Sequence, residues 1–99
     1  MIVLINPFEV QSGSEDAFFA VWRRVSGVME ARPGFIHTRL HRALAGSRFI
    51  NVAEWESQEA LAAALTSPEF QEAVVALREL GKESPALYEV AYEAGRPPA

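Results

Sequence analysis

Two asparagines and a tryptophan occupy positions of the sequence where apolar side chains are expected. Strand alternation puts Asn6 on the face that carries Leu4, and it puts Asn51 and Trp55 on the face that carries Phe49. A buried amide without a partner costs about 1–3 kcal/mol, so each asparagine must meet a backbone group, a water or a ligand. The hypothesis is a cleft in which amides bind a ligand oxygen. The alternative is that loop backbone satisfies both amides and that the tryptophan is ordinary core.

Histidine offers a second kind of chemistry. His37 and His41 are four residues apart in the alternating segment 35–42. A strand separates them by about 13 Å, so one metal ion cannot bind both. His37 shares a face with Phe35 and is the candidate nearer the cleft, as a substrate hydrogen-bond partner or a base, whereas His41 is expected at the surface. The chain also has no cysteine, and we predict no metal site.

Aromatic residues could complete such a cleft. Trp22 faces inward from a predicted helix, and Phe49 lies on the predicted face of Asn51. With His37, these two residues are our candidates for contacts to a bound ring, although core packing is the alternative for Trp22. The sequence has no glycine-rich phosphate loop, no nucleophile elbow and no paired carboxylates in an apolar setting. These absences argue against nucleotide and conventional hydrolase chemistry.

Length and charge narrow the classes of protein further. The chain has 99 residues, which suffices for one domain, and 49% of them are hydrophobic. Its net charge is −4 and its pI is near 5.1, the wrong sign for a nucleic-acid partner. The apolar run at residues 1–5 is too short for a signal peptide or a membrane span. We therefore expect a cytoplasmic protein without nucleic-acid or membrane partners.

The hydrophobic periodicity predicts six elements in the order β-α-β-β-α-β. We predict strands at 2–5, 35–42, 48–56 and 87–93, a helix between Ser14 and Arg32, and a second helix between Ser57 and Gly81 that is broken at Pro68. Residues 1–94 form the predicted domain and residues 95–99 a flexible C-terminal tail.

This order is that of the ferredoxin-like α+β fold, a four-stranded antiparallel sheet with both helices on one face. Such a fold leaves the second face of the sheet uncovered. Apolar side chains predicted on that face are Val3, Ile5, Ile36, Leu40, Ile50, Val52 and Val90. An apolar patch of that size is seldom left in water, so we predict a homodimer packed sheet to sheet.

Four stretches of the sequence resemble the antibiotic biosynthesis monooxygenase (ABM) domain superfamily, and the likeness extends over residues 2–93. They are Ile5-Asn6-Pro7-Phe8, Arg32-Pro33-Gly34-Phe35, Val52-Ala53-Glu54-Trp55-Glu56-Ser57-Gln58-Glu59-Ala60 and Ser67-Pro68-Glu69-Phe70. The resemblance implies a dimeric α+β barrel built on the ferredoxin-like fold. The superfamily also includes haem-degrading enzymes, quinol monooxygenases and isomerases.

Within this superfamily, cofactor-free monooxygenases of aromatic polyketide pathways use an Asn on the first strand and an Asn-x-x-x-Trp on the third. Asn6, Asn51 and Trp55 match that pattern. The resemblance implies that these three residues are catalytic in the oxidation of a small anthrone- or hydroquinone-type substrate by O2 to a quinone, with no cofactor. Some members also use an arginine in the second helical region, and here Arg78 is only near that position.

The expected chemistry assigns a role to each of these residues. Asn6 and Asn51 donate amide hydrogen bonds to the developing oxyanion, and Trp55 stacks on the ring. The haem-degrading branch needs a Trp and a His ligand at positions that read Ala64 and Val74 here, which argues against haem. Two alternatives stay open. The same amides could serve an isomerase without oxygen chemistry, or the domain could be a non-catalytic binding module.

Overall fold

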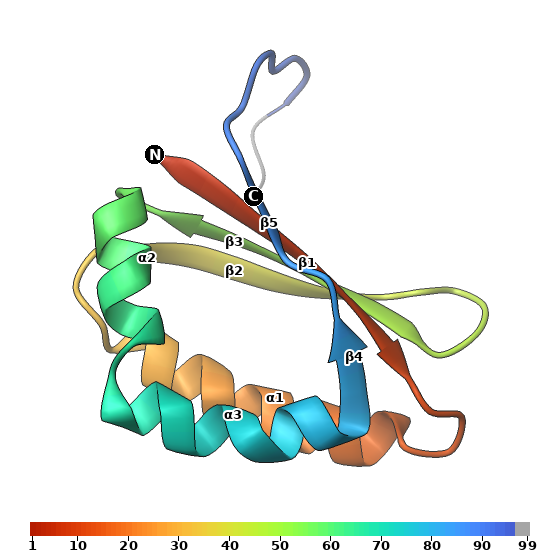
Figure 1. Ribbon diagram of the computed structural model, residues 1–99. Coiled ribbons are helices and arrows are strands. Elements are labelled where there is room, and N and C mark those ends of the chain that lie inside the picture. The colour runs from red at the N-terminus through yellow and green to blue at the C-terminus, as the bar shows by residue number, and fades with distance from the viewer. Residues whose placement is uncertain (97–99) are drawn as a thin grey trace.

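The chain folds into two layers, a sheet and a set of helices on one of its faces (Figure 1). This computed structural model describes residues 1–96. In chain order the elements are β1 (Ile2–Val10), α1 (Glu15–Glu30), β2 (Phe35–Arg42), β3 (Arg48–Trp55), α2 (Gln58–Leu65), α3 (Pro68–Leu80), β4 (Gly81–Glu83) and β5 (Ala86–Tyr88). The antiparallel sheet has the order β2-β3-β1-β4, and β5 also pairs with β1. The predicted ferredoxin-like α+β fold is confirmed.

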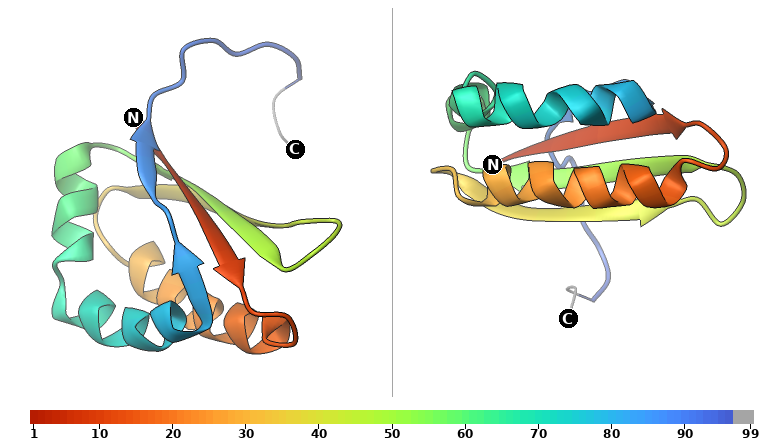
Figure 2. Two further views of the ribbon diagram at one scale, coloured as in Figure 1. Left: turned by 45° about the vertical axis from the view of Figure 1, so that its right-hand side comes forward. Right: turned by 90° about the horizontal axis from the view of Figure 1, so that it is seen from below.

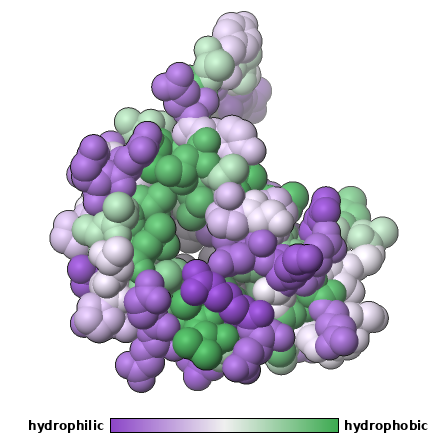
Figure 3. Space-filling model, viewed as in Figure 1, coloured by the Kyte–Doolittle hydropathy of each residue, from purple (hydrophilic) through white to green (hydrophobic). Residues whose placement is uncertain are grey.

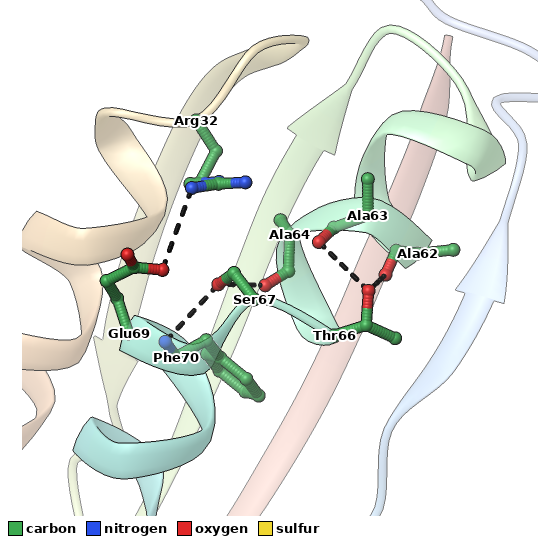
Figure 4. A network of polar contacts seen from close by, with 8 residues as sticks. All are labelled: Arg32, Ala62, Ala63, Ala64, Thr66, Ser67, Glu69 and Phe70. Carbon is green, nitrogen blue, oxygen red and sulfur yellow. Dashed lines mark hydrogen bonds and ion pairs between the residues drawn. The ribbon is translucent and has the colours of Figure 1, made fainter.

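The helices cover only one face of the sheet. Helices α1 and α3 lie side by side beneath the strands, and α2 stands at one end of the sheet (Figures 1 and 2). The break between α2 and α3 falls at Ser67-Pro68, as predicted. Oγ of Ser67 accepts a hydrogen bond from the amide of Phe70 and donates one to the carbonyl of Ala64, which joins the two helices (Figure 4). This corner of the chain carries α3 back under the sheet.

Strand β1 is longer than the sequence analysis predicted, because it continues through Pro7 to Val10. Proline lacks an amide hydrogen, which is why the predicted strand ended at Ile5. The structure tolerates Pro7 at the point where the partner of β1 changes from β5 to β4. The carbonyl of Pro7 still accepts a hydrogen bond from the amide of Ser84, at 3.0 Å. The strand therefore continues without a break past Asn6.

The last predicted strand, 87–93, was wrong in its bounds. The structure instead has two short strands, β4 and β5, separated at Ser84 and Pro85. Tyr88 pairs with Val3, close to the start of β1, so the residues after it meet no further strand among residues 1–96. This segment extends away from the two layers (Figure 1). Residues 97–99 of the predicted tail lie outside the described part of the chain.

Two groups of buried side chains hold the sheet to the helices. Phe18 of α1 packs against Phe8 and Phe49, with ring centroids 5.0 and 4.9 Å apart. At the other end of the sheet, Trp55 packs edge-on against Phe35 at 5.4 Å. Phe18 and Trp55 expose 0% and 1% of their surface. The space between these two groups is not filled.

Candidate active site

The unfilled space is a cavity of about 160 Å³ between the sheet and the helices. It is open to solvent on one side, and the surface in Figure 3 is hollowed near its centre. Its lining is mostly apolar. The polar or aromatic side chains that matter here are Asn6, Trp22, Thr38, Asn51, Trp55, Arg78 and Glu83. The cavity has the character of a small-molecule site, an apolar hollow with a few polar groups.

Two asparagines face each other across the strand pair at the cavity wall. Asn6 on β1 pairs directly with Asn51 on β3. Residues directly opposite in an antiparallel pair have Cβ atoms about 4.5–5.5 Å apart, on the same face of the sheet. Asn6 is 8% exposed and Asn51 is half-buried. Strand alternation predicted this shared inner face, and the register places the two amides side by side on it.

The amide of Asn6 is held by a carboxylate. Nδ2 of Asn6 donates to Oε2 of Glu83 at 3.2 Å, and Nε of Arg78 donates to Oε1 of Glu83 at 2.9 Å. Oδ1 of Asn6 is buried and has no hydrogen-bond partner. We expected both asparagines to donate to a ligand oxygen. One of the two hydrogens of the Asn6 NH2 group is already bound to Glu83, so the donor role expected for Asn6 stays a prediction that rests on the second hydrogen.

The amide of Asn51 is held the opposite way. Oγ1 of Thr38 on β2 donates to Oδ1 of Asn51 at 2.5 Å. The NH2 group of Asn51 is then the one left to donate. Thr38 and Asn51 both line the cavity. The expected role of Asn51 as a donor therefore agrees with its contacts.

The two tryptophans form aromatic walls of the cavity. Trp55 lies at the end of β3, where Phe35 meets it edge-on with an interplanar angle of 85°. Only 1% of the surface of Trp55 is exposed, so its ring forms a buried part of the cavity wall. Trp22 is half-buried on α1 and lines the cavity from the helical layer.

Two predicted contacts lie outside the cavity. The register of β2 against β3 shifts between Phe35 and His37, so Phe35 pairs with Trp55 and His37 with Glu54. This β-bulge turns the exposed His37 away from the helices and brings Thr38 to the cavity in its place.

Phe49 is in the packed core, at 2% exposure against the ring of Phe18, and not in the cavity lining. The bulge also corrects the predicted outer position of Leu40, which packs toward the core. Ile36 is 44% exposed.

Sequence reasoning missed Thr38 and Glu83 and left Arg78 in doubt. Glu83 reaches the site because β4 pairs with β1 so that Glu83 lies opposite Phe8, one diagonal step from Asn6. The sequence near Glu83 contains no pattern that predicts this register. The salt bridge from Glu83 to Arg78 is partly exposed, with 23% and 50% of the two side chains accessible, so its effect is mainly to orient the groups.

Within residues 1–96, no three His, Asp or Glu side chains gather closely enough to hold a metal ion. The helices in that part of the chain are also too short or too polar to cross a membrane.

The two-layer fold, with paired amides and aromatic walls around a cavity, defines a small α+β protein with a site for a small molecule. Residues 1–76 match the family model of antibiotic biosynthesis monooxygenase, and the chain belongs to that family. None of the curated proteins matches the sequence significantly.

Solved structures agree with this assignment. SnoaB from Streptomyces nogalater, a cofactor-independent oxygenase, superposes with a TM-score of 0.90 at 26% identity, over 96% of this chain and 97% of that one. A mutant of SnoaB with an asparagine replaced by alanine gives the same TM-score at 25% identity and the same coverage. An antibiotic biosynthesis monooxygenase described for Bordetella bronchiseptica shares the fold, with a TM-score of 0.81 at 23% identity, over 92% of this chain and 97% of that one.

Proposed function

We propose that this protein is a cofactor-independent monooxygenase that oxidises a small anthrone- or hydroquinone-type aromatic with O2 to a quinone. The observation that carries the proposal is the pairing of Asn6 with Asn51 on the wall of an apolar cavity that Trp22 and Trp55 also line. Family membership and the likeness to SnoaB support it. The resemblance in the sequence gives Asn6, Asn51 and Trp55 the catalytic roles.

The chemistry needs no group beyond the substrate and oxygen. Ground-state O2 is a triplet, so it reacts with a closed-shell molecule only after single-electron transfer. A deprotonated anthrone or hydroquinone is electron-rich enough to give that electron. The radical pair combines into a peroxide, which loses water to leave the quinone. The protein must therefore stabilise the substrate anion and hold it beside O2, away from bulk water.

Asn51 is the residue that stabilises the anion in this proposal. Its NH2 group donates to the oxyanion, and a preorganised donor of this kind is worth about 3–4 kcal/mol in the transition state. Trp55 and Trp22 bound the ring and exclude water. Because His37 faces away from the cavity, we assign the substrate proton to water at the open side.

The size of the cavity supports the proposed class of substrate. Apolar cavities of roughly 150 Å³ accept one small aromatic ring. The cavity here is about 160 Å³ and open on one side. A single ring therefore fits inside, and a fused-ring substrate extends through the opening.

Oxygen uptake by the purified protein, free of metal and flavin, tests the proposal with dithranol as substrate. We expect uptake above the spontaneous rate and a fall of about 100-fold or more in kcat for Asn51→Ala. Trp55→Ala should also lose activity. Gln11→Ala is the matched control, since it removes an exposed amide in a turn outside the cavity. Spontaneous rates for every variant and for the native protein would contradict the proposal for anthrones.

A binding or isomerase function is the second candidate. The observation that favours it is the buried acceptor on Asn6, which suits a hydroxylated ligand whether or not oxygen reacts. Saturable binding of aromatic ligands without oxygen uptake would support this candidate over the oxygenase.

We also propose that the protein is a homodimer. The helices cover one face of the sheet and leave its outer face without a helix (Figure 1). At the end of β5 and in the residues after it, large apolar side chains are exposed: 51% of Tyr88, 54% of Val90 and 85% of Tyr92. Residues 89–93 alternate like a strand yet meet no strand among the described residues, so a second copy can supply the missing partner. Sedimentation at micromolar concentration tests this. A monomer would contradict it, and Tyr92→Asp should weaken the dimer.

A further inference from the structure

Three residues form a chain of polar contacts along one side of the cavity. Nδ2 of Asn6 lies 3.2 Å from Oε2 of Glu83, and Nε of Arg78 lies 2.9 Å from Oε1 of the same carboxylate. A guanidinium only donates hydrogen bonds, and an ionised carboxylate only accepts them. The direction of each contact is therefore fixed by chemistry. Asn6 must turn its NH2 group toward Glu83.

This orientation also determines what the oxygen of the same amide can contact. Oδ1 of Asn6 is buried without a partner, and the residue lines the cavity. Buried polar atoms in folded proteins nearly always have a hydrogen-bond partner. No other described side chain donates to this oxygen. A ligand in the cavity can satisfy it only by supplying a hydrogen.

Asn51 offers the complementary group. Its Oδ1 accepts from Thr38, which leaves its NH2 group as a donor. Asn51 is the cross-strand partner of Asn6. The cavity wall thus presents one acceptor on β1 beside one donor on β3. A phenolic hydroxyl matches both, because its hydrogen can bind Asn6 while its oxygen accepts from Asn51.

We propose that Glu83, anchored by Arg78, is a positioning residue that fixes Asn6 as a hydrogen-bond acceptor, so that the cavity selects aromatic ligands with a free hydroxyl over their O-methyl ethers. The proposal rests on the proposed function only in taking this cavity as the substrate site, and it concerns the neutral form in which the ligand binds, before any deprotonation. An O-methyl ether can accept from Asn51, but it has no hydrogen for Asn6. The substrate class is therefore a free phenol or enol and not its ether.

Binding of 2-naphthol and 2-methoxynaphthalene, measured by ligand fluorescence under nitrogen, tests the proposal without turnover. The two probes share their ring and their oxygen acceptor and differ only in the hydroxyl hydrogen. We expect the native protein to bind 2-naphthol about 10-fold more tightly, although the methyl group adds apolar surface. Asn6→Leu should abolish this preference.

Glu83→Gln gives the sharper result. Arg78 only donates, so the introduced amide must turn its oxygen toward Arg78 and its NH2 group toward Asn6. Asn6 then turns its own oxygen to that NH2 group and presents a donor to the cavity. The preference for 2-naphthol should fall from about 10-fold to 1-fold or below. A merely structural role for Glu83 would weaken both probes equally and leave their ratio unchanged.

A further variant controls for the loss of charge. Glu79→Gln removes the same charge from an exposed position on α3 that does not line the cavity, and it should keep the native ratio.

Equal affinity of the native protein for the two probes, absence of binding for both, or an unchanged ratio in Glu83→Gln would overturn the proposal. A native preference that Glu83→Gln removes, in a protein that takes up no oxygen with dithranol, would support this inference while rejecting the oxygenase.

Discussion

Two neighbouring cross-strand pairs on the inner face of the sheet differ in whether a side chain of the helical layer covers them. The cross-strand pair Phe8 and Phe49 is closed by Phe18 from α1. Two residues along the same strands, Asn6 and Asn51 face a cavity that no side chain fills. The backbone pairing is the same at both places. The two places differ in their side chains and in whether a helix side chain packs against them.

This difference separates stability from function within one strand pair. The phenylalanine pair removes apolar surface from water and ties β1 and β3 to α1. The asparagine pair gives up packing and leaves one acceptor unsatisfied, which costs stability. A protein retains such a position when a ligand uses it. The variants below are ordered by the size of the effect that tests this separation.

The largest effect on stability is expected at the packed position. Phe18→Ala removes the ring that joins Phe8 and Phe49, and it should lower the free energy of unfolding by about 3–5 kcal/mol, measured by urea denaturation. Ligand binding in the fraction that remains folded should change little. A loss below about 1 kcal/mol would show that the two positions do not differ as proposed.

Asn51→Ala is expected to lower activity much more than stability, the reverse of Phe18→Ala. Its kcat with dithranol should fall about 100-fold or more, while the free energy of unfolding changes by about 1 kcal/mol, the value of its hydrogen bond to Thr38. Parallel measurements of oxygen uptake and urea denaturation check this. A stability loss as large as that of Phe18→Ala, with full activity, would make Asn51 a structural residue.

Asn6→Leu should stabilise the protein. The substitution removes the unpartnered Oδ1 and adds apolar contacts at the cavity wall, for a gain of about 1 kcal/mol in the free energy of unfolding. Thermal and urea unfolding would both report it. A loss of stability instead would mean that the contact of Asn6 with Glu83 is needed for folding.

Glu15, in the first turn of α1, gives the smallest effect. Its own backbone amide, then the hydroxyl of Ser47 and the amide of Gly13, lower the pKa of this carboxyl below its ordinary value of 4.5. A lowered pKa stabilises the fold above the unfolded-state pKa, and this contribution is lost as the pH falls through the folded-state pKa. Glu15→Gln should therefore be slightly less stable than the native protein at pH 7, and the difference should diminish as the pH falls below 4.5. A difference that grows on acidification would contradict this assignment.

The fold was predictable because its signals are local. Period-two alternation marked the segments 35–42 and 48–56, and Ser67-Pro68 marked the break between α2 and α3. The shared inner face of Asn6, Asn51 and Trp55 followed from the same alternation. In each of these cases the conformation and the facing of a residue are determined by its neighbours in sequence.

The errors arose where pairing between distant segments overrode local pattern. The bulge after Phe35 reversed the faces expected for His37 and Leu40, because an extra residue in one strand shifts every later side chain. Strand 87–93 was predicted from its alternation. Tyr88 already pairs with Val3, and β1 begins at Ile2, so the residues after Tyr88 have no part of β1 left to pair with.

The sequence alone determined that an apolar sheet face would carry two amides and a tryptophan, since residue type and strand period are local properties. Only the tertiary structure decided which atoms of those amides are free. That choice depends on Glu83, which reaches Asn6 through the pairing of β4 with β1, and on Thr38, which reaches Asn51 through the bulge. Hydrogen-bond direction is set by the partner, and the partner is set by strand register, which joins segments far apart in the chain.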